Sequence, residues 1–68
     1  MRSDRIYLNG KVNALVLNAT DIAECTEGSA PFTLHEVDTI LRVLEAIREV
    51  TADLEATFKR IWTETGGD

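Results

Sequence analysis

The stretch that decides the fold covers residues 33–65 and reads TLHEVDTILRVLEAIREVTADLEATFKRIWTET, with no Pro or Gly inside it. Its apolar residues recur at alternating steps of three and four, which is the seam of an α-helix that packs on other helices. The seam consists of Val37, Ile40, Leu44, Ile47, Thr51, Leu54, Phe58 and Ile61. We therefore predict one helix over residues 33–64, about 48 Å long at a rise of 1.5 Å per residue.

Both ends of this helix carry recognisable signals. Thr33 and Glu36 have the spacing of a capping box, in which the Glu36 carboxylate reaches back to the Thr33 amide. Pro31 precedes this box, and Gly66 and Gly67 follow the last apolar residue as a stop signal.

The apolar stripe of this helix is uneven in width. In the first half, flanking apolar residues widen it beyond half of the circumference; they are Leu34, Leu41, Val43 and Val50. In the second half Arg48 and Glu55 occupy the flank, and the stripe narrows. A wide stripe needs two neighbours whereas a narrow one needs one. We therefore expect residues 34–50 to pack on two sides.

The first half of the chain supports two interpretations. Apolar residues at helical steps, with Ile22 as the last, predict a helix over residues 11–26, and residues 4–8 either extend it or form a short strand. The alternative is a β-hairpin over residues 5–17, because Asn9-Gly10 is typical of a tight β-turn. We favour the helix, since its pattern continues past Leu17. Residues 28–31 then form the interhelical loop, with Gly28 near the C-cap.

The predicted fold is thus an all-α helical hairpin in a single small domain, residues 1–68, with the first helix about half as long as the second. Such a short first helix would not reach Phe58 and Trp62. The alternative fold is the β-hairpin followed by one long helix.

So small a hairpin has little core, and chains of this size usually add disulfides, a metal or oligomerisation. The single Cys25 allows no intrachain disulfide. We therefore expect a homodimer that forms a four-helix bundle. The expected oligomer interface comprises Val37, Ile40, Leu41, Leu44, Ile47, Val50, Leu54, Phe58, Ile61 and Trp62.

The composition argues against several classes of function. Twelve acidic and seven basic residues give a net charge of −5, which disfavours direct binding to nucleic acid. His35 is the only histidine, and the zinc motif that His35-Glu36 would begin lacks its second histidine, because Thr39 stands there. We expect no catalytic, cofactor or metal site, and hence no enzyme. The longest apolar run, residues 14–17, is too short for a membrane span or a signal peptide, so a cytoplasmic location is the default expectation.

These observations predict a non-enzymatic acidic protein that self-associates and acts by protein–protein contact, as an accessory, regulatory or inhibitor protein of the kind that phages and mobile elements often encode. One alternative is an oligomer that binds a small ligand between subunits, near Tyr7 or Trp62. Another is a nucleic-acid mimic that blocks a basic groove through an acidic row. The candidate partner-binding residues are Glu45, Glu49, Asp53, Trp62 and Tyr7.

Overall fold

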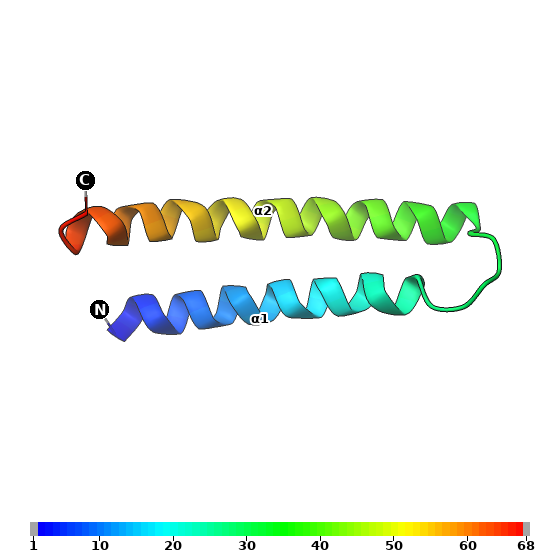
Figure 1. The fold of residues 1–68 in the computed structure, drawn as a ribbon, viewed down its shortest axis with the longest axis horizontal. Helices are drawn as coiled ribbons and strands as arrows, with labels where there is room; N and C mark the ends of the chain where they lie inside the picture. The colour runs from blue at the N-terminus through cyan, green and yellow to red at the C-terminus, as the bar shows by residue number, and fades with distance from the viewer. Residues whose placement is uncertain (1, 68) are drawn as a thin grey trace.

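The computed structural model describes residues 2–67, with side chains from Asp4 onward, and contains two helices. Helix α1 spans Arg2–Cys25 and helix α2 spans Leu34–Glu64. They run antiparallel, and both termini lie at the end of the hairpin opposite the loop (Figure 1). The all-α hairpin is confirmed. No strand occurs within residues 2–67, so the alternative β-hairpin over residues 5–17 is wrong. Met1 and Asp68, the outer ends of the predicted domain 1–68, lie outside the described residues.

The ends of α2 agree with the prediction from sequence. The Glu36 amide donates to Thr33 Oγ1 at 3.1 Å, and the Thr33 amide donates to Glu36 Oε1 at 2.9 Å, which completes the capping box. At the other end Gly66 has a φ of +103°, and the Gly67 amide donates to the Trp62 carbonyl at 2.8 Å. This pattern is a Schellman motif, which a glycine with positive φ allows.

Helix α1 is longer than predicted, because it begins at Arg2 instead of residue 11; it ends at Cys25, one residue early. The Asn9-Gly10 pair lies inside the helix, where Asn13 Nδ2 donates to Asn9 Oδ1 at 3.2 Å. Leu8, just before this pair, is 9% exposed and is the one buried side chain among residues 4–67. Its burial opposes the entropic penalty of a helical glycine, which is about 1 kcal/mol. The expectation that the first helix would be too short to reach Phe58 was therefore wrong.

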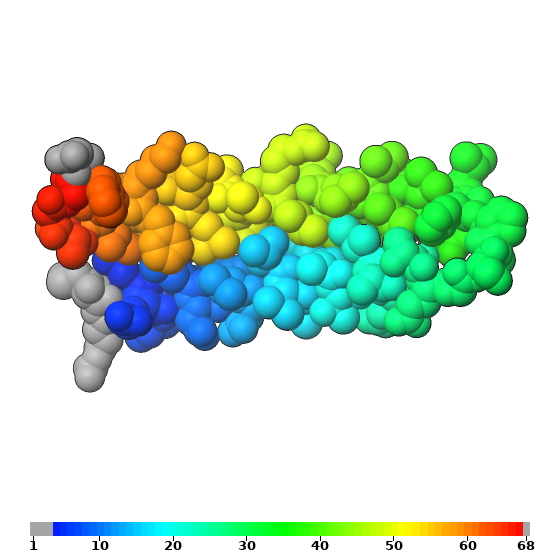
Figure 2. All heavy atoms as spheres, in the orientation of Figure 1, coloured from blue at the N-terminus to red at the C-terminus, as the bar shows by residue number. Residues whose placement is uncertain are grey.

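The two helices touch along α1 from Asp4 onward (Figure 2). On each helix the least exposed residues recur at steps of three and four, and these inner stripes face each other. The inner stripe of α1 is Asp4, Leu8, Lys11, Leu15, Asn18, Ile22 and Cys25. The inner stripe of α2 is Glu36, Ile40, Val43, Ile47, Val50, Leu54, Thr57 and Ile61. The hairpin thus has one thin apolar layer and no second layer behind it.

Candidate functional site: an open apolar face

The most distinctive surface is formed by the residues that come one position after each inner-stripe residue in the two helices. One residue is about 100° of helical rotation, and because the helices are antiparallel this rotation carries both sets to the same side of the hairpin. These residues are all exposed. We call the apolar ones the apolar face: Val12, Val16, Ala19 and Ala23 from α1, with Val37, Leu41, Leu44, Thr51, Phe58 and Trp62 from α2.

Large side chains on the apolar face remain in contact with solvent. Leu41 is 59% exposed, Phe58 52% and Trp62 61%. The whole chain exposes 5575 Å², whereas a compact monomer of its 7.6 kDa mass would expose about 4,300 Å². One hairpin alone therefore leaves about 1,300 Å² more surface in water than a globular protein of its size.

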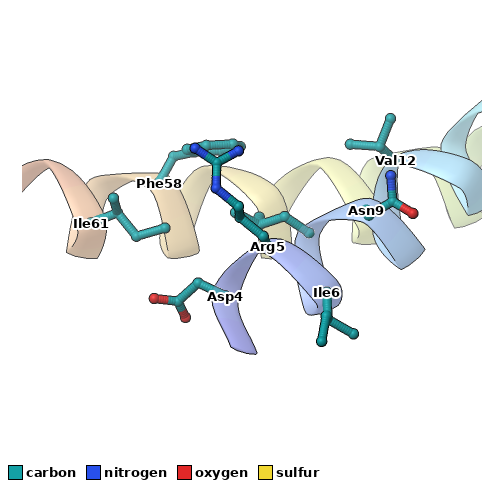
Figure 3. A pocket seen from close by; sticks show the side chains of 8 residues that line it. Asp4, Arg5, Ile6, Asn9, Val12, Phe58 and Ile61 are labelled. Atoms are coloured by element: carbon teal, nitrogen blue, oxygen red, sulfur yellow. The ribbon is translucent and has the colours of Figure 1, made fainter. Parts of the chain in front are cut away.

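A groove of about 730 Å³ opens on the apolar face near the chain ends (Figure 3). Leu8 and Ile61 come from the inner stripes, and Val12 and Phe58 flank them from the apolar face. Arg5 extends from α1 toward Phe58, as Figure 3 shows. Both helices line this groove. The C-terminal end of α2, which was predicted to lie beyond the reach of the first helix, is therefore covered by α1 on one side.

Trp62 stands at the edge of the apolar face beneath the C-terminal turn. A Cβ atom at Gly67 would overlap the Trp62 indole, so only glycine fits there without displacing the ring. The same indole, with Phe58 and Ile61, lines a second hollow of about 530 Å³. The Schellman turn thus places the backbone against the tryptophan, whose side chain is 61% exposed.

The opposite side of the hairpin is formed by the residues that come one position before each inner-stripe residue. It carries ion pairs between the helices. We call it the charged face. Lys11 Nζ lies 3.1 Å from Asp53 Oδ2, and Arg60 Nη2 lies 2.7 Å from Asp4 Oδ1. The hydrogen bond from Lys11 to Asp53 raises the pKa of Lys11, and electrostatic interaction with Tyr7 raises that pKa further. The centre of the Tyr7 ring lies 5.5 Å from Lys11 Nζ.

The predicted partner-binding residues are divided between surfaces. Glu45 is exposed on the outer side of α2 and Glu49 on the charged face, one residue before Val50, while Asp53 is engaged by Lys11. Tyr7 lies on the charged face and Trp62 on the apolar face. The structure therefore does not bring the two aromatic residues together in the groove, which Tyr7 does not line.

The predicted oligomer interface is likewise divided, because the single wide seam is two stripes. Half of its residues lie in the inner stripe, facing α1: Ile40, Ile47, Val50, Leu54 and Ile61. The other half lie exposed on the apolar face: Val37, Leu41, Leu44, Phe58 and Trp62. Sequence reasoning missed Val12 and Val16 as members of this face. Their position one residue after Lys11 and Leu15 is the signal that identifies them.

The remaining reactive side chains are dispersed. Cys25 is half-buried in the inner stripe, and His35 is exposed in the first turn of α2. Among the described residues no three His, Cys, Asp or Glu side chains gather as metal ligands would. Over the same residues, neither helix has the length and apolar character of a membrane span.

Comparisons of the chain with protein-family models, with curated proteins and with solved structures find no match.

Proposed function

We propose that this chain is a non-enzymatic interaction protein that pairs through its apolar face into a homodimeric four-helix bundle. In that form it binds a larger protein as an accessory, regulatory or inhibitor subunit. The observation that carries the proposal is the apolar face itself, which lies on one side of a hairpin whose only internal layer is thin.

The exposed area supports the first part of the proposal. The excess of about 1,300 Å² over a compact monomer exceeds the roughly 800 Å² that each partner contributes to a standard protein interface. A contiguous row of exposed large apolar side chains such as the apolar face marks an association surface. Pairing two such faces supplies the second apolar layer that each hairpin lacks.

The charge distribution supports the second part. Pairing through the apolar face leaves the charged face and the outer side of α2 in water, and each chain carries a net charge of −5. An acidic surface attracts a basic partner and speeds its association. Asp53 is engaged by Lys11, whereas Glu45 and Glu49 form no ion pair within residues 4–67 and are the part of the predicted row proposed to meet a partner.

The test of self-association is the solution mass, measured by light scattering after size exclusion over a range of concentrations. We expect two chains per particle for the parent protein. Leu41→Asp should give one chain, since it places a charge in the apolar contact. Leu17→Asp is the matched control, because Leu17 is 67% exposed but lies on the charged face. A parent mass of one chain, or a Leu41→Asp variant that keeps the parent mass, would contradict the proposal.

A small-ligand function is the second candidate, and the groove of about 730 Å³ is the observation that favours it. Its volume and apolar lining are those of a typical ligand site. A thermal-shift screen of small apolar compounds tests this function, because a ligand that binds only the folded chain raises the melting temperature. Phe58→Ala should abolish such a shift; a shift that survives this substitution would place the ligand elsewhere.

A further inference from the structure

We infer that the second copy docks with its loop at the opposite end of the bundle, so that the two α2 helices cross antiparallel at Thr51. This inference rests on the proposed homodimer and adds the orientation and the contacts of the partner. It is argued from the register of the hairpin, from the order of residues along the apolar face and from one arginine on that face.

The side of α2 that bears the apolar face follows a regular sequence of steps of four and three: Leu41, Leu44, Arg48, Thr51, Glu55, Phe58 and Trp62. In an antiparallel pair of identical helices, two residues lie opposite each other when their numbers add to nearly the same value. With the two-fold axis beside Thr51, the pairs Leu41 with the partner subunit's Trp62 and Leu44 with the partner subunit's Phe58 add to 103 and 102, a difference of one residue or about 1.5 Å along the helix. Each aromatic ring then meets an exposed leucine, and the alternation of large and smaller side chains fills the contact.

The same register places Arg48 opposite the partner subunit's Glu55. Arg48 is exposed beside the apolar face and forms no ion pair within residues 4–67, although most arginines of α2 do. Glu55 Oε1 contacts Lys59 Nζ at 2.9 Å, which leaves Oε2 for a guanidinium group. Because a two-fold axis repeats every contact, the dimer would hold two such ion pairs, one on each side of Thr51.

Helix α1 brings Val12 close to this axis. The pairs Lys11–Asp53 and Asp4–Arg60 set the register of the hairpin and place Thr51 level with residue 13 of α1. A two-fold axis at that level lies within about one residue of Val12. The Val12 side chains of the two chains therefore meet near the axis, and the apolar contact continues from α2 onto α1.

The competing arrangement has both loops at one end, and it is less complementary. There α2 lies over the partner's α1 with the register of the hairpin itself. Arg48 would then lie over Val16 of the partner subunit, and Glu55 over Asn9 of the partner subunit. A guanidinium group against an apolar side chain loses hydration without gaining a partner, so the observed charges favour opposite ends.

Charge reversal tests the ion pair. Arg48→Glu and Glu55→Arg each place like charges opposite one another twice in the dimer, and we expect each to weaken association by about tenfold or more in sedimentation equilibrium. The double variant restores opposite charges and should recover most of the parent affinity. Arg42→Glu on the charged face is the matched control and should leave association unchanged. Additive weakening in the double variant would overturn the inference.

Spin labels test the orientation. The chain with Cys25→Ser and Ser29→Cys carries one label in each loop, away from the apolar face. Loops at opposite ends of the bundle lie about 50 Å apart, estimated from a rise of 1.5 Å per residue between Thr51 and the start of α2 at Leu34, counted on both sides of the axis. Double electron–electron resonance should report that long distance. A distribution centred below about 25 Å would place both loops at one end and overturn the inference.

Different results contradict the homodimer and its orientation. A parent protein that remains monomeric at high concentration contradicts the proposed homodimer and this inference together. A dimer with adjacent loops, or without rescue by the double charge reversal, contradicts the orientation and leaves the homodimer intact.

Discussion

The two long faces of the hairpin derive from the same heptad pattern and differ in what each leaves unfinished. On the charged face, Lys11 with Asp53 and Asp4 with Arg60 connect the helices within one chain. On the apolar face, exposed residues such as Leu41 and Phe58 have no second layer of protein above them. The charged face therefore fixes the register of the hairpin, and the proposed association would draw its free energy from the apolar face. Residues one position before the inner stripe form the charged face, and residues one position after it form the apolar face. One step along the sequence in either direction therefore separates these two roles.

The largest expected effect comes from the layer between the two faces. Leu8→Ala removes the one buried side chain among residues 4–67 and should destabilise the fold by about 2–5 kcal/mol, the usual range for a buried leucine. Thermal unfolding followed by circular dichroism measures this effect. Leu17→Ala, on the charged face, is the control and should change the melting temperature little. Equal effects of the two substitutions would mean that the inner layer does not hold the hairpin together.

The next effect sharpens the role of the apolar face. For the parent protein we expect the melting temperature to rise with chain concentration, because association stabilises the folded state by mass action. Leu44→Ala removes an exposed leucine from the apolar face and should reduce this rise, with little change at the lowest concentration. Melting curves at concentrations a hundredfold apart measure it. A parent melting temperature that is independent of concentration would mean that neither face drives association.

A smaller effect is expected on the charged face. Asp53→Asn breaks the ion pair with Lys11, and exposed ion pairs contribute little to stability. We expect the melting temperature to fall by no more than a degree or two, and the difference to disappear in 1 M NaCl because salt screens exposed charges. A large loss of stability, or one that persists at high salt, would show that Asp53 does more than set the register.

The smallest effect concerns the capping box. Hydrogen bonds from Thr33 lower the pKa of Glu36, so the carboxylate contributes stability above its unfolded pKa and loses it as pH falls through the lowered value. Glu36→Gln keeps the geometry but has no charge to titrate. Its melting temperature should therefore differ slightly less between pH 7 and pH 3 than that of the parent. An unchanged difference would mean that Glu36 does not contribute to the acid sensitivity.

How far the sequence predicts the fold depends on the strength of the local signals. Around Thr33 and Gly66 these signals are strong, and the ends of α2 were predicted to within a residue. Around Asn9-Gly10 they conflict, because a turn dipeptide lies in a helix whose stability comes from contact with α2. Packing between distant segments is not written in local propensity, so the start of α1 at Arg2 was missed.

The candidate site was predicted in part, for a related reason. The width of the stripe indicated two packing surfaces on α2, but one sequence does not say where the boundary between them falls. The register set by Lys11 and Asp53 draws that boundary, with Ile40 and Val43 on the inner side and Leu41 and Leu44 on the outer side. Val12 and Val16 joined the site only when α1 was placed against α2.

The indole held beneath Gly67 also has an optical consequence. Trp62 is the only tryptophan of the chain, so all indole fluorescence reports from one position at the rim of the apolar face. A ring that is 61% exposed emits at long wavelength and is accessible to iodide. When a second hairpin covers the apolar face, the emission maximum shifts to the blue and quenching decreases. The unlabelled protein thus carries its own spectroscopic probe of whether that face is open or covered.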